Sequence, residues 1–208
     1  MLHYSTVEQK TANLLKDLMQ LEELNNFCLV GGTCLALKYG HRKSIDLDFF
    51  NPHPFDNNKL VDILSEKFPS FVTNSSVNAL GVFGYIDGIK VDFIKHQNFK
   101  LIEPIEIIDD IRMFNVKDIM AMKVYAILQR GQKKDFWDVA ELLNHYKITD
   151  FIQAYETKYP QNQMLISINY ALTFFDDAND SEDPVSLKGQ TWESVQQTIS
   201  KAVREYLS

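Results

Sequence analysis

The spacing of apolar residues divides the chain into a first part of short strands and helices and a second part that is helical throughout. Before residue 116, short apolar runs bounded by Gly, Pro and Asn predict strands at 27–30, 45–50, 71–73, 82–86 and 89–94. Apolar residues at helical spacing predict helices at 7–24, 33–39 and 57–68. Further along, the same spacing predicts helices at 116–129, 135–145, 149–158, 161–174 and 192–207. The pattern therefore predicts an α+β protein.

Turn and cap residues mark where several of these elements end. Thr33 is a candidate N-cap, and Gly40 a candidate stop, for the second helix. The pair Asp87-Gly88 predicts a two-residue hairpin between two strands. The polar segment 176–189 is typical of a surface loop.

The change of period also suggests how the chain is organised. A length of 208 residues suits one large domain or two small ones. We expect a mixed sheet with flanking helices in residues 1–112 and a helical C-terminal domain in residues 113–208. No internal repeat or low-complexity tract interrupts this division.

The amino-acid composition limits the cellular environment and the kinds of partner that we expect for this chain. Hydrophobic residues make up 45% of the chain, which is enough for a sizeable core. The net charge of −7 means that a polynucleotide partner needs a local basic patch or metal ions at the contact. Cys28 and Cys34 are too few for a disulfide framework, so we expect both to be packing residues. No secretion signal and no apolar run near 18 residues occurs, and we expect no membrane association and a reducing cytoplasm.

The candidate chemistry begins with two carboxylates that flank one apolar residue. Because side chains alternate along a strand, Asp46 and Asp48 point to one face while Leu47 points to the other, toward a core. Two like charges side by side repel unless a cation lies between them or one pKa is raised. Carboxylate oxygens are the ligands that Mg²⁺ prefers, often together with substrate phosphates. The pair therefore indicates a metal–nucleotide site.

Two further features extend this site. Asp92 lies on a later strand, and if the two strands are neighbours, three carboxylates converge on one or two cations. Two such cations favour an in-line phosphoryl displacement. The turn Gly31-Gly32-Thr33 at a helix start offers backbone N–H groups and a hydroxyl to a triphosphate.

A helical hairpin in the second half carries charges of both signs. Lys123 and Arg130 are seven residues apart, so they lie on nearly one helix face. Asp135 and Asp138 open the next helix, where acids suit the helix dipole. Two interpretations remain open: a role in the site, or an Arg130–Asp138 or Lys123–Asp135 ion pair that only fixes the hairpin. We expect the adjacent Phe136 and Trp137 to pack between domains rather than stack on bases.

The loop before the paired acids is basic. His41, Arg42 and Lys43 either steer a triphosphate or an RNA end toward the site or form a solvated turn. Ser44 either makes a hydrogen bond in the site or caps a turn. Lys90 and Lys95 flank Asp92, and we expect them to balance its charge.

Three segments carry a resemblance to a known family. They are GGTCLALKYGHRKSIDLDFF at 31–50, VDFI at 91–94 and DIMAMKVYAILQRGQKKDFWDVAELL at 118–143. The chain resembles the polymerase β-like nucleotidyltransferases, in which a Gly-rich turn precedes Asp-x-Asp and a later Asp. More narrowly, it is similar to the AbiEii/AbiGii-type nucleotidyltransferase toxins of type IV toxin–antitoxin systems.

The resemblance implies roles for the candidate residues. Asp46, Asp48 and Asp92 would bind Mg²⁺ or Mn²⁺, and Asp92 would also help to activate the acceptor hydroxyl. Lys123 would touch the nucleotide phosphates, and Asp135 would match a later Asp motif. The residues expected to bind substrate are Gly31, Gly32, Thr33, Arg42, Ser44, Arg130 and Asp138.

The implied activity is transfer of a nucleotidyl group (an NMP) from an NTP to an acceptor hydroxyl. The resemblance suggests an RNA acceptor, such as the 3′ end of tRNA, and a toxin that a cognate antitoxin protein neutralises. Two alternatives remain: an antibiotic or a protein side chain as acceptor, or a nucleotide-binding or interaction protein without catalysis.

Overall fold

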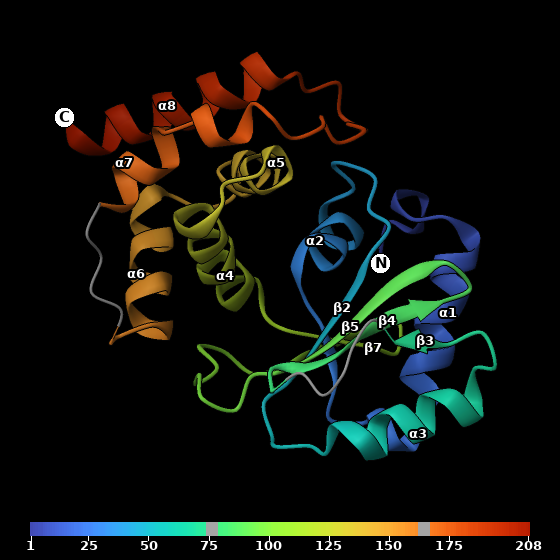
Figure 1. Cartoon of the computed structure of the whole chain (residues 1–208). Helices are drawn as coiled ribbons and strands as arrows, with labels where there is room; N and C mark the ends of the chain where they lie inside the picture. Colours follow the sequence, from blue (N-terminus) through green and yellow to red (C-terminus); the bar gives the residue numbers. More distant parts are fainter. Residues whose placement is uncertain (74–78, 162–166) are drawn as a thin grey trace.

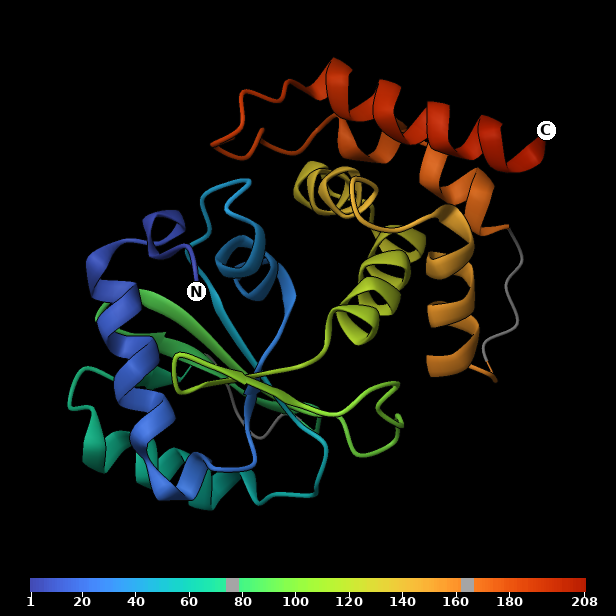
Figure 2. The same ribbon diagram turned by 180° about the vertical axis from the view of Figure 1, so that it is seen from behind.

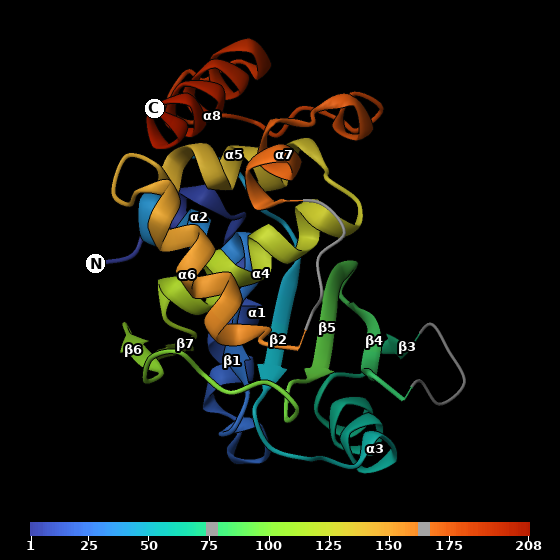
Figure 3. The same cartoon turned by 90° about the vertical axis from the view of Figure 1, so that its left-hand side faces the viewer.

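The computed structural model describes residues 1–73, 79–161 and 167–208. Within these ranges, seven strands form one mixed sheet in the order β3-β4-β5-β2-β1-β7-β6, and Figure 3 shows them side by side. The strands are β1 Cys28–Leu29, β2 Leu47–Asn51, β3 Val72–Thr73, β4 Gly81–Ile86, β5 Ile89–Lys95, β6 Glu106–Ile108 and β7 Ile111–Met113. Two pairs, β2 with β5 and β1 with β7, are parallel, and the others are antiparallel.

The helices fall into two groups around this sheet. They are α1 Gln9–Gln20, α2 Gly31–Tyr39, α3 Asn57–Lys67, α4 Val116–Gln129, α5 Lys133–Leu142, α6 Ile148–Lys158, α7 Ile168–Thr173 and α8 Trp192–Leu207. Helices α4 to α8 gather on one side of the molecule, and the sheet with α1 and α3 forms the other side (Figure 1). Helix α2 lies between the two groups and contacts both β2 and α5, as the view from behind also shows (Figure 2).

Most of the elements predicted from the apolar pattern are confirmed. The strands at 45–50 and 89–94 and the helices at 57–68, 116–129 and 192–207 are found within a residue or two of their expected bounds. The helix expected over 161–174 is found as α7, and residues 162–166 of that prediction lie outside the described residues. Strands β6 and β7 were not predicted, because three-residue strands are too short to show a period.

The cap assigned to α2 from the sequence is wrong. The helix begins at Gly31, the N-cap position is Val30, and the Thr33 hydroxyl bonds elsewhere. Gly40 does end the helix in the left-handed conformation, with φ of 66°. The helix therefore points its first turn of backbone N–H groups, without a capping side chain, at the end of β2 that carries the paired acids.

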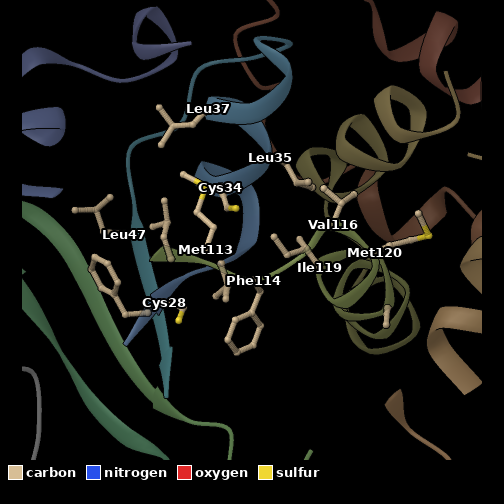
Figure 4. Close-up of a cluster of buried hydrophobic side chains, with 14 of the residues drawn as sticks. Cys28, Cys34, Leu35, Leu37, Leu47, Met113, Phe114, Val116, Ile119 and Met120 are labelled. Atoms are coloured by element: carbon tan, nitrogen blue, oxygen red, sulfur yellow. The ribbon is translucent and has the colours of Figure 1, made fainter. Parts of the chain in front are cut away.

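The core explains why the acids face away from it. Phe49 of β2 stacks on Phe93 of β5 with ring centroids 5.2 Å apart, and Leu47 and Phe49 are buried as predicted. On the other side of the sheet, Leu35 of α2 lies beside Val116 and Ile119 of α4 (Figure 4). Because Leu47, Phe49 and Phe93 fill the core on one face of the sheet, the alternating residues Asp48 and Asp92 lie on the opposite face.

The helical half has an aromatic core of its own. Phe136 and Trp137 are fully buried, and Trp137 stacks on Trp192 at 5.7 Å. The expectation that these aromatics pack is confirmed, but their ring partners, Phe175 and Trp192, lie in the helical half itself, so packing between domains stays a prediction. Burial raises the pKa of Cys28 to about 11 and that of Cys34 to about 12, which keeps both thiols protonated. The boundary expected between residues 112 and 113 falls inside β7 and stays a prediction.

The loop before α8 returns to the sheet-bearing half. Its backbone pairs with the loop after α2: Lys43 N–H donates to Val185 O at 2.9 Å, and Leu187 N–H donates to His41 O at 2.8 Å. Arg42 and Ser186 form an isolated antiparallel bridge between these bonds. This connection joins residues that are more than 140 positions apart in the chain.

None of the described helices is both long enough and apolar enough to cross a membrane.

Candidate active site

The register of β2 and β5 brings the predicted acids together. The two strands pair in parallel, with Asp48 beside Asp92 and Leu47 beside Val91. Neighbouring strands lie about 4.8 Å apart, so cross-strand side chains on the same face are close neighbours. The expectation that these two strands adjoin is therefore confirmed. The individual roles of the acids in metal binding and catalysis stay predictions.

The acidic cluster consists of Asp46, Asp48 and Asp92, with Lys90 among them. Lys90 Nζ lies 2.5 Å from Asp92 Oδ2. Asp92 is only 6% exposed, and its other oxygen, Oδ1, is buried without a hydrogen-bond partner. One carboxylate of the cluster is thus half satisfied.

Charge and burial act against each other in this cluster. Burial raises the pKa of Asp48, Lys90 opposes that shift, and the charges of Asp92 and Asp46 add to it. Partial burial works against the charge of Lys90, but the hydrogen bond to Asp92 and the nearby carboxylates together raise its pKa. The cluster therefore lacks positive charge, which is the condition that a bound cation relieves.

The chemistry of these groups fits a divalent cation. Among the described residues, no set of three or more His, Cys, Asp or Glu side chains has the ready-made geometry of a metal site. Three carboxylates on two adjacent strands are nevertheless the hard oxygen donors that Mg²⁺ and Mn²⁺ take. The unpartnered Asp92 Oδ1 is an oxygen that such an ion would satisfy.

Two glycines keep the start of α2 open toward the cluster. Gly31 has φ of +69°, and a Cβ there would lie 3.0 Å from Asp48 Oδ2. A Cβ on Gly32 would lie 2.2 Å from Arg42 Nη2, a guanidinium that is itself held in place. A side chain at either position would force Asp48 or Arg42 to shift, and both glycines line the cleft.

Thr33 and Ser44 fix the loop between α2 and β2. Their hydroxyls lie 2.8 Å apart, and the Thr33 hydroxyl also donates to the backbone carbonyl of Asp46. Ser44 lines the cleft, and its role in binding substrate stays a prediction. The Thr33–Ser44 contact and the bond to the Asp46 carbonyl therefore hold the start of β2, which carries Asp48, against α2.

The ion-pair network consists of His41, Arg42, Lys123, Asp135 and Asp138. Asp138 is fully buried; Arg42 Nε and Nη2 donate to its two oxygens at 2.7 and 2.9 Å, and His41 Nε2 lies 2.7 Å from Oδ1. Lys123 Nζ lies 2.7 Å from Asp138 and 2.8 Å from Asp135. The network joins the loop after α2 to helices α4 and α5.

Each charge in this network has a partner of opposite sign. Burial would raise the pKa of Asp138, but Arg42 and Lys123, with the hydrogen bonds from His41 and Arg42, hold it well below its usual range. Burial would lower the pKa of Lys123, but Asp135 and Asp138 raise it. The carboxylate and the ammonium therefore remain charged inside the protein.

The network corrects two expectations. Among the described residues Asp138 is bound by His41, Arg42 and Lys123, and Arg130 is exposed, so the Arg130–Asp138 pair does not form. The Lys123–Asp135 pair does form. His41 and Arg42 are buried, at 0% and 3% exposed, so the interpretation of this loop as a solvated turn is wrong.

All the predicted site residues except Asp138 line one cleft of about 480 Å³. Asp138 lies behind Arg42 and Lys123. The basic residues that line the cleft are Arg42, Lys90, Lys95, Lys123, Arg130 and Lys134. Four aspartates line it as well, so six basic residues face four acids there although the whole chain carries −7.

The far end of the cleft is an aromatic wall that the apolar pattern did not reveal. It is formed by Phe50, His96, Phe99, Tyr125 and Tyr159. Phe99 and Tyr125 are 40% and 38% exposed, and each ring packs on Tyr159 at 5.1 Å. Burial, helped by the charge of Lys158, lowers the pKa of His96 to about 3, so this imidazole is neutral. The wall combines residues from β2, α4, the end of α6 and the segment after β5, so no single stretch of sequence predicts it.

Comparison with solved structures shows the fold. JHP933 from Helicobacter pylori superposes with a TM-score of 0.56 at 16% identity, covering 96% of this chain and 92% of that one. MenT4, nucleotidyltransferase toxin Rv2826c from Mycobacterium tuberculosis H37Rv, has a TM-score of 0.56 at 13% identity, with 94% and 84% covered. The fold is that of the polymerase β-like nucleotidyltransferases, as the resemblance implied.

The family follows from the sequence itself. A model of the family described as nucleotidyl transferase AbiEii toxin, type IV TA system, matches residues 13–205. The chain belongs to this family and is a nucleotidyltransferase. The uncharacterized protein aq_aa25 of Aquifex aeolicus (strain VF5) is 33% identical over 209 residues, covering 96% of both chains.

Proposed function

We propose that this nucleotidyltransferase transfers an NMP from an NTP to the 3′-hydroxyl of an RNA, with Mg²⁺ or Mn²⁺ held by Asp46, Asp48 and Asp92. The proposal rests on one observation: the acidic cluster lines the same cleft as six basic residues and the aromatic wall. The carboxylates suit the reacting phosphate, and the remainder of the cleft suits polyanionic and aromatic ligands.

The open N-terminus of α2 is our assignment for the triphosphate. Gly31 and Gly32 line the cleft in the first turn of α2, and a helix N-terminus favours phosphate because its backbone N–H groups lack partners within the helix. Arg130 and Lys134 line the same cleft, and Arg130 is exposed. Lys123 is held by two aspartates, so it supplies fixed positive charge rather than a mobile arm.

The acidic cluster is our assignment for the reacting centre. A divalent ion bound there would supply Lewis-acid stabilisation of the phosphoryl oxygens. Asp92 Oδ1, which has no partner, is placed to accept a hydrogen bond from an acceptor hydroxyl. Such a contact orients the hydroxyl and makes its oxygen more nucleophilic.

The aromatic wall is our assignment for a nucleobase. Exposed rings stack on bases whatever the base, and this stacking is a common way to hold single-stranded nucleic acid. Phe99 and Tyr125 offer such ring faces, and Tyr159 supports both.

The balance of charge favours RNA over a cationic antibiotic. Six basic residues against four acids in the cleft attract phosphates and repel an aminoglycoside-like cation. The family implies a cognate antitoxin. We propose that it binds this protein and suppresses the transfer.

Label transfer from NTPs tests the proposal directly. Purified protein, Mg²⁺ and each α-labelled NTP would be incubated with total tRNA, with periodate-oxidised tRNA, with aminoglycosides and with protein acceptors. We expect label on intact tRNA and none on oxidised tRNA, because oxidation destroys the terminal hydroxyls. Label on an aminoglycoside or on protein alone would contradict the RNA acceptor, and no transfer to any acceptor would contradict the activity.

A further inference from the structure

The position of Lys90 within the acidic cluster has a consequence for metal binding. Asp48 pairs with Asp92 across the two strands, Asp46 directly precedes β2, and Lys90 lies two residues before Asp92 on β5. Residues two apart on a strand share a face and lie about 6.6 Å apart. The charges of all three carboxylates act on Lys90, so the cluster combines three acids with one ammonium.

We propose that Lys90 is a built-in cation that competes with the divalent metal for Asp92. The inference rests on the proposed function, in which the metal binds this cluster. In the metal-free protein, the ammonium neutralises Asp92 and limits repulsion among the three acids. A divalent ion at Asp92 Oδ1 would meet the positive charge of Lys90 on Oδ2 of the same carboxylate, so its binding is weakened until Lys90 moves away.

The contacts around Asp92 support this assignment. Lys90 Nζ lies 2.5 Å from Asp92 Oδ2, and in the described part of the chain no other ion pair involves Asp46, Asp48 or Asp92. The pair is therefore the one direct ion pair of the acidic cluster within the described residues, while Lys123 and Arg42 act on Asp48 and Asp46 without such a contact.

Lys90 also has the freedom that such competition requires. Its side chain is 40% exposed, whereas that of Asp92 is 8% exposed. A lysine carries its charge on a flexible four-carbon stem, so the ammonium can move into the cleft while the strand stays fixed. When NTP is bound, the triphosphate offers the displaced ammonium a new partner. Lys90 therefore favours metal binding together with nucleotide over metal binding alone.

The competition has a measurable size. An ammonium and a divalent ion about 5 Å apart repel, even with the screening of bulk water, enough to weaken metal affinity on the order of tenfold. Replacing Lys90 with the uncharged, similarly shaped Met removes both the repulsion and the competing ion pair. The affinity of the nucleotide-free protein for metal should then rise.

The test is Mn²⁺ binding to nucleotide-free protein, followed by calorimetry and by electron paramagnetic resonance of free Mn²⁺. We expect Lys90→Met to bind Mn²⁺ at least about tenfold more tightly than wild type. The same variant should melt at a lower temperature without metal and gain more from saturating Mn²⁺. Lys90→Arg keeps the charge and should bind Mn²⁺ as weakly as wild type.

Lys95→Met is the matched control, since it removes the same charge from the same strand. Lys95 Nζ lies over the ring of Phe55, 5.3 Å from its centroid, and forms no ion pair with the three acids among the described residues. Equal affinity in wild type and Lys90→Met, or an equal gain in Lys95→Met, would overturn the inference and leave the proposed function standing. No Mn²⁺ binding in any variant would overturn the metal site together with the inference.

Discussion

The acidic cluster and the ion-pair network both place aspartates beside one cleft, but they treat those charges in opposite ways. Asp138 is fully buried, and three side chains bind it, including a two-point contact from Arg42. Asp92 is nearly as buried, yet one of its oxygens has no partner. A buried charge left incomplete in this way is expensive, so it persists where a ligand completes it.

The two pKa shifts express the same contrast. The pKa of Asp138 lies well below its usual range because positive charge surrounds it, whereas burial and neighbouring acids raise that of Asp48. Asp138 is thus fully paired by oppositely charged side chains, although Asp135 Oδ2 and His41 Nδ1 of the same network are buried without a partner. Among the described residues, the acidic cluster has one ion pair, between Lys90 and Asp92, for its three carboxylates. This difference separates aspartates that hold the fold from aspartates that we propose act on substrate.

The strongest test of the contrast is Asp48→Asn. We expect nucleotidyl transfer to fall by about a thousandfold or more, because a charged ligand of the metal is lost. We expect the melting temperature to stay the same or to rise, because the raised pKa shows that the carboxylate charge is disfavoured in the metal-free fold. Label-transfer rates and thermal melts measure both effects. Asp62→Asn on the exposed surface of α3 is the control, and retained activity in Asp48→Asn would refute the site assignment.

Asp138→Ala should have the opposite signature. Removing this carboxylate leaves Arg42 and Lys123 buried beside one remaining acid, and we expect a loss of about 3–5 kcal/mol in the free energy of unfolding. Urea denaturation measures the loss. Asp183→Ala removes a surface partner of Lys133 and should cost less than about 1 kcal/mol. Similar losses in the two variants would mean that the network is not the joint between the two halves.

Tyr125→Ala tests the aromatic wall, which belongs to neither charged region. We expect KM for the base-bearing substrate to rise about 5- to 150-fold, the equivalent of 1–3 kcal/mol for one stacked base, with little change in melting temperature. Tyr125→Phe keeps the ring and should behave like wild type. Tyr206→Ala removes another exposed tyrosine, on α8, and controls for general effects. An unchanged KM in Tyr125→Ala would contradict the assignment of a nucleobase to the aromatic wall.

His96→Phe should give the smallest effect, visible only as a dependence on pH. Because the pKa of His96 is lowered to about 3 in the folded protein, the unfolded chain binds a proton below about pH 6.5 while the folded protein does not. From that pH down toward pH 3, His96 therefore costs the wild type about 1.4 kcal/mol of stability per pH unit. The phenylalanine variant should lack this contribution, as urea denaturation at pH 7 and pH 5 would show. If both proteins lost the same free energy of unfolding between pH 7 and pH 5, the lowered pKa of His96 would be contradicted.

Much of the acidic cluster was predictable because its residues lie close together in the sequence of each strand. Alternation along β2 puts Asp46 and Asp48 on one face, and the same rule puts Lys90 with Asp92 on β5. Their convergence needed only that the two strands adjoin. The strands and helices with clear periods were predictable for the same reason.

The remaining features depend on tertiary contacts that no local pattern encodes. His41 looked like part of an exposed basic turn, and its burial follows from a partner 97 residues away. In the aromatic wall, Phe99 lies in a loop, Tyr125 lies in α4, and Tyr159 is the residue that follows α6. Thr33 has the composition of an N-cap, but its hydroxyl is used by Ser44 and the Asp46 carbonyl instead. In each case the competing partner lies far along the chain.

The bridge between Arg42 and Ser186 sets an order in time for the newly made chain. The catalytic strands are complete by residue 95, but the loop that holds Arg42 gains its backbone partners only when residues 185–187 have left the ribosome. Because domains generally fold as they emerge, the sheet can form first and the cleft can close last. For a toxin, that order delays a finished active site until synthesis is nearly over.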